Sequence, residues 1–268
     1  MILRELPADL TSKAISSLLS EAEHPSGIPL CHTARKRKYE CPLRKKGRYM
    51  NKLQIEKQIL GIVRTNCYLA VNKETKECII IDPADEAVKV RVLIEEQQLK
   101  PAAILLTHGH FDHIGAAEEL AQRYRIPICA GSEEKEVLED AGLNLSAKHG
   151  ISFTVCADRL LSNKEIAEMA GFQIQVLHTP GHTKGGTCYY FAREGVLFSG
   201  DTLFYESIGR TDLPTGSMTA LVHSVNELLQ MLPDSTDVYP GHGSATDAAH
   251  EKKFNPFISA SNEPCAGM

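Results

Sequence analysis

From residue 51 onward, short apolar or alternating runs are separated by polar, turn-like breaks. A run of four to eight residues with period two, or one that is continuously apolar, is typical of a β-strand. The runs that predict strands are Gln54–Leu60, Cys67–Val71, Cys78–Ile81, Ala102–Leu106, Pro127–Ala130, Phe172–Leu177, Thr187–Phe191, Val196–Phe198 and Val238–Tyr239.

Three segments between these strands have helical spacing: Asp85–Gln98, Gly115–Tyr124 and Met218–Leu232. In the first, Val88 and Val92 stand four positions apart and share one helical face. The last has apolar residues throughout at helical spacing and predicts a strongly amphipathic helix. Strands and helices thus come in two similar rounds, which predicts a two-sheet core with helices outside.

The first fifty residues differ from the rest. They contain one short helical stretch, Leu10–Leu19, and basic runs at Ala34–Tyr39 and Arg44–Arg48. They carry ten Lys and Arg against five Asp and Glu, whereas the remainder carries 19 against 29. The basic run could bind nucleic acid or an anionic surface, but we favour a solvated extension of unknown role over residues 1–50. Residues 51–268 then form the main domain, whose acidic balance argues against a broad nucleic-acid surface.

The composition is that of an ordinary globular protein, with 43% hydrophobic and 24% charged residues. No stretch approaches the roughly 20 apolar residues of a membrane helix. The N-terminus lacks the features of a secretory signal, so we expect a cytoplasmic protein. The eight cysteines form no CxxC pair, and we interpret them as reduced, mostly buried thiols.

Four residues able to bind metal fall within six positions directly after a predicted strand: His108, His110, Asp112 and His113. At the end of an extended strand, positions two apart face the same way, so His108 and His110 could reach one ion. Asp112 and His113 follow where the chain turns toward the next helix. These four alone do not fix which ion each would serve.

Three further candidates, His182, Asp201 and His242, each follow an apolar strand in the same way. Imidazole nitrogens and carboxylate oxygens suit zinc, iron or manganese. A carboxylate such as Asp201 has two oxygens and can bridge two cations. Together the seven side chains predict a site for two metal ions.

The run Thr-His-x-His-x-Asp-His, followed by Gly-His-Thr, Gly-Asp and Gly-His-Gly, resembles the metallo-β-lactamase superfamily over Gln54–Ile258. The resemblance implies an α/β fold, the αββα four-layer sandwich. It also implies a division of ligands: a first trio for one ion, a second trio for the other, and Asp201 bridging them. The first trio is His108, His110 and His182; the second trio is Asp112, His113 and His242.

Within that superfamily the segments Gly200–Phe204 and Ser207–Pro214 are similar to glyoxalase II-like hydrolases. The resemblance places Arg210 where a basic residue binds the substrate carboxylate, although a surface ion pair is an equally good reading. Tyr205 is a further candidate for substrate contact. Two departures leave the thiol open: Asp212 stands where a tyrosine is expected, and the sequence ends about 26 residues after His242, which predicts a short form without the helical C-terminal domain.

The implied chemistry is attack by a metal-bound hydroxide on a small-molecule thioester or ester, with two divalent ions, zinc before iron or manganese. Asp112 and Asp201 would orient the nucleophile as well as bind metal. Alternatives on the same scaffold are an iron-dependent persulfide dioxygenase using His108, His182 and Asp201, a lactonase, a nuclease, or a non-catalytic binding module.

Asp82 either hydrogen-bonds a ligand histidine or forms a turn before Pro83. The oligomeric state stays open.

Overall fold

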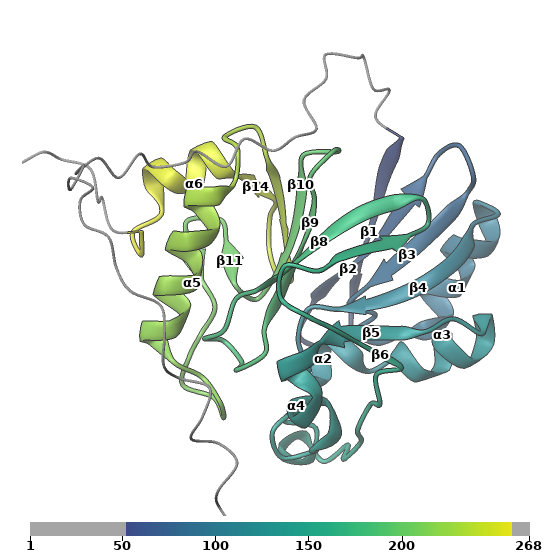
Figure 1. Cartoon of the computed structure of the whole chain (residues 1–268). Coiled ribbons are helices and arrows are strands. Elements are labelled where there is room, and N and C mark those ends of the chain that lie inside the picture. Colours follow the sequence, from purple (N-terminus) through teal and green to yellow (C-terminus); the bar gives the residue numbers. More distant parts are fainter. Residues whose placement is uncertain (1–51, 259–268) are drawn as a thin grey trace, which may run out of the picture. The chain divides into compact units, whose positions relative to one another are not determined.

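The structure is a computed structural model, and it describes residues 52–258 (Figure 1). The predicted extension over residues 1–50 and its basic runs lie outside these residues, so its role and its boundary stay predictions. In the part of the chain that the structure describes, no helix is long and apolar enough to cross a membrane.

Two six-stranded mixed sheets form the centre of the domain, and each is built in an order that follows the chain. The first sheet runs β1 (Leu53–Leu60), β2 (Thr65–Asn72), β3 (Glu77–Ile81), β4 (Lys100–Leu106), β5 (Ile128–Gly131) and β6 (Arg159–Leu161). The second runs β14 (Thr246–Asp247), β13 (Asp237–Pro240), β10 (Val196–Gly200), β9 (Thr187–Phe191), β8 (Phe172–His178) and β7 (Ile166–Met169). A separate hairpin joins β11 (Leu203–Phe204) to β12 (Ser207–Ile208).

The helices cover the outer faces of the two sheets (Figure 1). On the first sheet lie α1 (Ala87–Glu96) and α3 (Ala117–Tyr124), with α2 (Phe111–Ile114), α4 (Lys135–Glu139) and the short 3-10 turns η1 (Ser132–Glu134) and η2 (Ala147–His149) near its edge. On the second lie α5 (Met218–Met231) and α6 (Ala248–Phe254). The resulting order of layers is helix, sheet, sheet, helix, as the resemblance implied.

Three separate apolar clusters hold these layers together, and strand alternation explains them. In β2, Cys67 and Leu69 face the helices of the first sheet, while Tyr68 and Ala70 face the second sheet. Successive side chains of a strand point to opposite faces, so a strand buried on both sides is apolar throughout. The middle cluster, between the sheets, contains the aromatic rings of Phe191 and Phe198, which meet edge to face.

Each of the nine predicted strands overlaps an observed one, and α5 matches the predicted amphipathic helix. Short elements such as β6, β7, β14 and α6 were not predicted. The predicted helix Gly115–Tyr124 is observed as α3, which begins at Ala117. A separate short helix, α2, precedes it and places Asp112 and His113 on a helical turn, where the sequence predicted only a turn of the chain. Val88 and Val92 do share a face of α1, but it is the solvent face, since Ala87, Val90 and Ile94 are the buried residues.

Candidate metal centre

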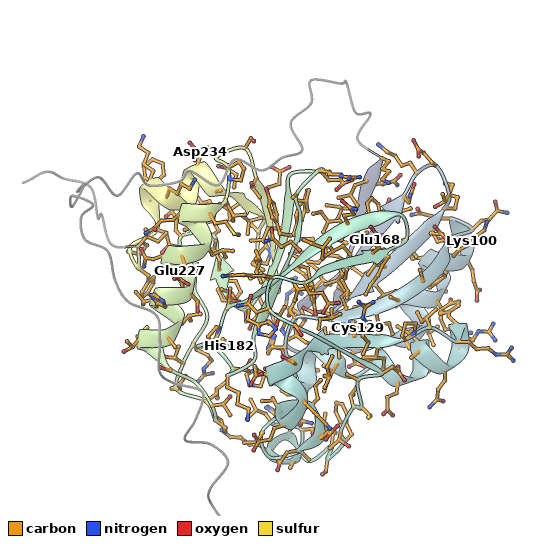
Figure 2. The ribbon with its side chains drawn as sticks, in the orientation of Figure 1. Lys100, Cys129, Glu168, His182, Glu227 and Asp234 are labelled. Carbon is orange, nitrogen blue, oxygen red and sulfur yellow. The ribbon has the colours of Figure 1, made fainter. Side chains whose placement is uncertain are left out.

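The seven predicted ligands converge at one end of the sandwich, where several strands finish. His182 lies in the interior there, whereas Lys100, Glu227 and Asp234 point outward to solvent (Figure 2). His108 and His110 follow β4, Asp112 and His113 lie on α2, and His182, Asp201 and His242 follow β8, β10 and β13. The prediction that both β4 histidines extend the strand was wrong in detail, because β4 ends at Leu106 and a loop presents them.

The first trio forms a tight group of buried imidazoles. Nδ1 of His110 lies 2.9 Å from Nε2 of His182. The ring of His108 lies 4.8 Å from each of their rings, in edge-on orientation. One ligand atom from each of the three can meet at a single point.

The second trio lies directly beside the first. Oδ2 of Asp112 is 3.3 Å from Nε2 of His242 and 3.7 Å from Nε2 of His113. Two ligands of one tetrahedral zinc ion, with bonds of about 2.1 Å, stand roughly 3.4 Å apart. The observed spacings are therefore those of atoms that can share an ion.

Asp201 lies between the two trios. Its Oδ2 is 3.5 Å from Nε2 of His182 in the first trio and 3.6 Å from Nε2 of His242 in the second. Its Oδ1 is 3.5 Å from Nε2 of His113. A carboxylate in this place can serve both ions, which is the arrangement that the resemblance implied.

Four atoms of the centre are buried and have no hydrogen-bond partner within the described residues: Nε2 of His108, His110 and His113, and Oδ1 of Asp201. A buried polar atom without a partner costs about 1–3 kcal/mol. Coordination of two cations would satisfy all four, because imidazole nitrogens and a carboxylate oxygen are all metal ligands. The cluster thus fits a binuclear metal site, while the identity of the metal is left open by this geometry.

Two imidazoles of the first trio, those of His108 and His110, are held neutral, which is the form that binds metal. Burial, followed by the neighbouring histidines, lowers the pKa of His108 well below its ordinary value. Burial and the adjacent His182 lower the pKa of His110 to about 3.

The second trio has the opposite electrostatics because carboxylates surround it. Burial lowers the pKa of His113, but the charges of Asp201, Asp112 and Asp82 outweigh it and raise the pKa to about 10. Burial raises the pKa of Asp112, yet His113 and His242 together hold it well below its usual range. The second trio is thus suited to bind a cation, and His113 must lose a proton when the ion binds.

Asp82 is placed behind the ligands, as one of its two predicted roles required. Its Oδ2 lies 3.0 Å from Nδ1 of His113, and the same carboxylate accepts hydrogen bonds from the backbone N–H and the hydroxyl of Thr107. A φ of 49° at Asp82 turns the chain sharply after β3. Such a carboxylate fixes the ring and leaves Nε2 facing the metal position.

Arg210 is tied to the centre by its backbone rather than by its side chain. Its carbonyl accepts a hydrogen bond of 2.7 Å from Nδ1 of His182. Its guanidinium forms two hydrogen bonds of 2.7 Å with the carboxylate of Asp212, and both side chains are largely exposed. The structure thus contains the surface ion pair, and substrate binding by Arg210 stays a prediction.

Tyr205, the other candidate for substrate contact, stacks on His250 of α6 with ring centroids 4.9 Å apart. Its neighbour Phe204 is the aromatic residue that approaches the centre, with its ring 6.3 Å from that of His242. The sequence pattern did not distinguish these two neighbours, because Phe204 ends β11 while Tyr205 lies in the turn that follows.

Residues of β2 that the sequence did not single out hold the second trio in place. The hydroxyl of Thr65 donates to Oδ2 of Asp112 at 3.2 Å. The side-chain amide of Asn66 donates to the carbonyls of Pro240 and Gly243 on either side of His242, and the hydroxyl of Tyr68 also donates to Pro240. Side chains of the first sheet therefore fix a loop of the second.

Two glycines next to ligands are required by close packing. A Cβ at Gly241 would lie 2.4 Å from Oδ1 of Asp201 and 2.7 Å from Cε1 of His113. A Cβ at Gly200 would lie 2.3 Å from the hydroxyl of Thr107, and its φ is 49°. A larger residue at position 241 would displace Asp201 or His113, and one at position 200 would displace Thr107, the residue before His108.

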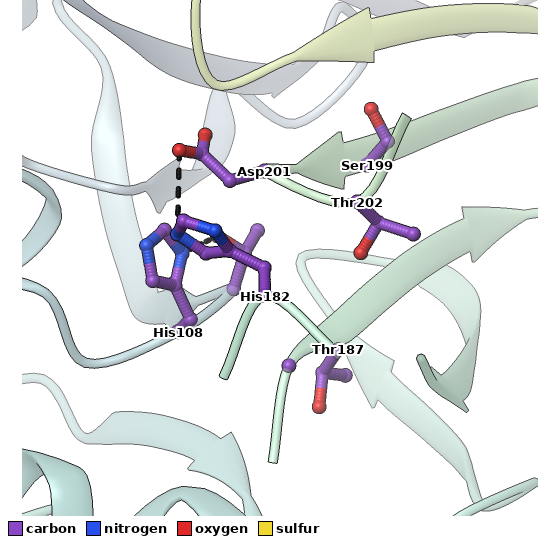
Figure 3. Close-up of a pocket in the computed structure, with 8 residues that line it drawn as sticks. His108, His182, Thr187, Ser199, Asp201 and Thr202 are labelled. Carbon is purple, nitrogen blue, oxygen red and sulfur yellow. Dashed lines mark hydrogen bonds and ion pairs between the residues drawn. The ribbon is translucent and has the colours of Figure 1, made fainter. Parts of the chain in front are cut away.

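A small pocket of about 150 Å³ borders the centre beside His108, His182 and Asp201 (Figure 3). Its other walls are polar or small residues: Thr107, Gly186, Thr187, Ser199 and Thr202.

Comparison with known proteins agrees with this geometry. The profile of the metallo-beta-lactamase superfamily matches residues 60–242. The chain is 40% identical to a probable metallo-hydrolase, YqgX of Bacillus subtilis, over 75% of this chain and 95% of that protein. It is 37% identical to hydroxyacylglutathione hydrolase GloC of Haemophilus influenzae, over 73% of this chain and 93% of that protein.

Solved structures give the same picture. BLEG-1 B3 metallo-beta-lactamase superposes with a TM-score of 0.73 at 42% identity, covering 77% of this chain and all of that one. TTHA1623 in a di-iron-bound form gives 0.67 at 36%, covering 76% and all of that chain. ETHE1 from Myxococcus xanthus gives 0.63 at 29%, covering 76% and 83%. With its fold, its cluster of histidines and aspartates and these matches, the chain belongs to the metallo-beta-lactamase superfamily.

Proposed function

We propose that this protein is a hydrolase that uses two divalent metal ions, zinc in the first instance, to cleave a small-molecule thioester or ester. The observation that carries the proposal is the convergence of seven side chains into two trios on either side of Asp201, with buried ligand atoms that lack protein partners. Similarity to a hydroxyacylglutathione hydrolase supports the thioester class. Similarity to a probable metallo-hydrolase supports hydrolysis more generally.

The ions, when bound, would polarise the substrate carbonyl and lower the pKa of water toward neutrality. The protein's own side chains would orient the attacking water and hold the two halves of the site together. Asp112 stays ionised at neutral pH, and with Thr65 fixing its Oδ2 it can accept a hydrogen bond from the attacking water. Asp201, central to both trios, would hold the two halves of the site in register. No protein nucleophile is needed.

Arg210 is our candidate for binding a carboxylate on the substrate. Its backbone carbonyl accepts a hydrogen bond from Nδ1 of His182, so the residue lies next to the first trio. A substrate carboxylate would compete with Asp212 for the guanidinium. Tyr205, on the neighbouring hairpin, stays a weaker candidate.

The proposal is tested by incubating the purified, zinc-loaded chain with hydroxyacylglutathione, a thioester of a smaller thiol, an ester and a lactone. Release of thiol or acid is followed for the wild type and for His110→Ala. We expect turnover of at least one thioester by the wild type and none by the variant. Equal turnover by both proteins would refute the assignment, and exclusive turnover of the lactone would make the protein a lactonase.

The second candidate is an iron-dependent dioxygenase acting on a persulfide. It would need only His108, His182 and Asp201, which line one pocket together, and a structure similar to this one holds two irons. Iron content and oxygen uptake with a persulfide separate the two functions, because a hydrolase consumes no oxygen.

We also propose a cytoplasmic location and a small-molecule rather than a nucleic-acid partner. The five cysteines within residues 52–258 are all free, as expected in a reducing compartment, and all but Cys156 are buried. The acidic balance outside the first fifty residues disfavours nucleic acid.

A further inference from the structure

Glu134 is a fully buried carboxylate that belongs to neither trio. It ends the 3-10 turn η1, which follows β5, and its side chain has no exposed surface. Burying a carboxylate is costly unless hydrogen bonds compensate it. The position of those hydrogen bonds therefore tells what the residue does.

The three donors to Glu134 come from the two loops that carry the first trio. Its Oε1 accepts the backbone N–H of Gly109 at 2.8 Å. Its Oε2 accepts the hydroxyl of Thr183 and the backbone N–H of Gly185, each at 2.9 Å. Gly109 stands between His108 and His110, and Thr183 follows His182.

Close packing reinforces these contacts. A Cβ at Gly185 would lie 2.2 Å from the backbone nitrogen of Glu134, and a Cβ at Gly109 would lie 3.0 Å from the side chain of Val137 in α4. Both ligand loops thus rest directly on the segment that contains η1 and α4. The three ligands of the first trio come from loops of different sheets, and Glu134 is bonded to both loops.

We propose that Glu134 is a positioning residue for the first trio, a carboxylate that joins the His108–His110 loop to the His182 loop and fixes the distance between their imidazoles. It would touch neither ion nor substrate. The inference rests on the ligand set of the proposed function, and it goes beyond that function by assigning a role outside the seven ligands.

The chain offers a matched control in Glu251. This glutamate is also fully buried and accepts hydrogen bonds from the hydroxyl of Thr246, the side-chain amide of Asn255 and the backbone N–H of Glu206. None of these donors is adjacent to a member of the first trio. Substituting it perturbs a buried carboxylate network without loosening the His182 loop.

The experiment compares Glu134→Gln, Glu134→Ala and Glu251→Gln with the wild type. Glutamine keeps the volume of Glu134 but replaces one acceptor oxygen with an N–H₂ donor, which must face at least one of the three donors. Zinc affinity is measured by competition with a chromophoric chelator, and the visible spectrum of the cobalt-loaded proteins reports the geometry of each site.

We expect Glu134→Ala to lower the affinity for one of the two ions by about 10–100-fold, and Glu134→Gln to lower the affinity for the same ion by less. The affinity for the second ion should be unchanged. The cobalt spectrum should change for that ion alone. Glu251→Gln should leave both affinities and the spectrum as in the wild type, whatever its effect on the melting temperature. If Glu134→Ala does not fold, Glu134→Gln carries the comparison.

The inference would be overturned if folded Glu134→Gln and Glu134→Ala both bound the two ions with wild-type affinity. It would also be overturned if the Glu134 variants and Glu251→Gln all lost affinity equally at both sites. Binding of no ion by the wild type would overturn it together with the metal centre. Because zinc and cobalt are the only probes, a protein that binds both ions but hydrolyses no thioester would refute the proposed function alone.

Discussion

Nδ1 of His113 lies 3.0 Å from Oδ2 of Asp82, and both side chains are buried. The two residues are 31 positions apart, and the pair joins the end of β3 to α2. Because Nδ1 is engaged, Nε2 is the atom that faces Asp112 and Asp201. The orientation of the second trio therefore depends on a carboxylate that is itself not one of the proposed ligands.

Substitution Asp82→Asn should lower the affinity of the second trio for its ion by about 10–100-fold. An amide has one acceptor oxygen instead of two, so it cannot accept hydrogen bonds from both Thr107 and His113 as the carboxylate does. Metal content after dialysis against a weak chelator checks this. Asp234→Asn is the matched control, since that carboxylate pairs with Lys252 at the surface. Retention of both ions by Asp82→Asn at wild-type affinity would contradict the assignment.

Zinc affinity of the second trio should rise with pH. The carboxylates around His113 raise its pKa to about 10, so the metal-free protein carries an imidazolium there at neutral pH. An arriving ion must displace that proton, so the proton competes with zinc, and affinity should rise by about tenfold per pH unit below the pKa. Chelator competition from pH 6.5 to 8.5, with calorimetry in buffers of different ionisation enthalpy, measures the slope and the proton released. A flat profile without proton release would disprove this account.

Arg210→Ala should raise KM a few-fold for thioesters that carry a carboxylate and leave kcat near the wild-type value. The backbone carbonyl that holds His182 is kept in this variant, so the metal centre should be intact. Asp212→Ala should lower KM for the same substrates, because it frees the guanidinium from its ion pair. An uncharged thioester is the control substrate. Equal effects on charged and uncharged substrates would remove Arg210 from the substrate site.

The packing between the sheets should be sensitive to loss of one aromatic ring. Phe198 is fully buried, and its ring lies 5.3 Å from Tyr68 and 5.4 Å from Phe191. Phe198→Ala should lower the free energy of unfolding by about 3–5 kcal/mol, and Phe198→Leu by less. Urea titration of the metal-free proteins measures the difference. A cost below about 1 kcal/mol would mean that this cluster is not a packed core.

The sequence was sufficient for the main strands and for the seven side chains that cluster at the candidate metal centre, because both depend on local patterns: apolar runs, and donor side chains directly after them. It was not sufficient for the side chains that hold the loops of the metal centre in place. Glu134 lies in the acidic run Ser132–Glu136, which is typical of a solvent-exposed turn, and Asn66 lies in a strand that is apolar on both faces. Their roles come from hydrogen-bond partners 25 to 177 residues away, and single-sequence periodicity carries no information on such contacts.

The helix α2 and the buried face of α1 were not predicted for a related reason. Helix α2 is one turn long and is stabilised by its surroundings, for example by the hydrogen bond from the N–H of Phe111 to the carbonyl of Asn144. Isolated single turns are unstable, so local propensity did not predict it. The exposed face of α1 was ambiguous in the same way, because valines at helical spacing occur on both sides of it.

Elemental analysis of the purified chain, with stoichiometry, tests the central claim most directly. The wild type should bind two divalent ions per chain, and Asp201→Ala and His110→Ala should each lose metal together with hydrolysis, while His223→Ala, an exposed histidine on α5, should lose neither. A wild type that binds no ion, or Asp201→Ala with two ions and full turnover, would contradict the account.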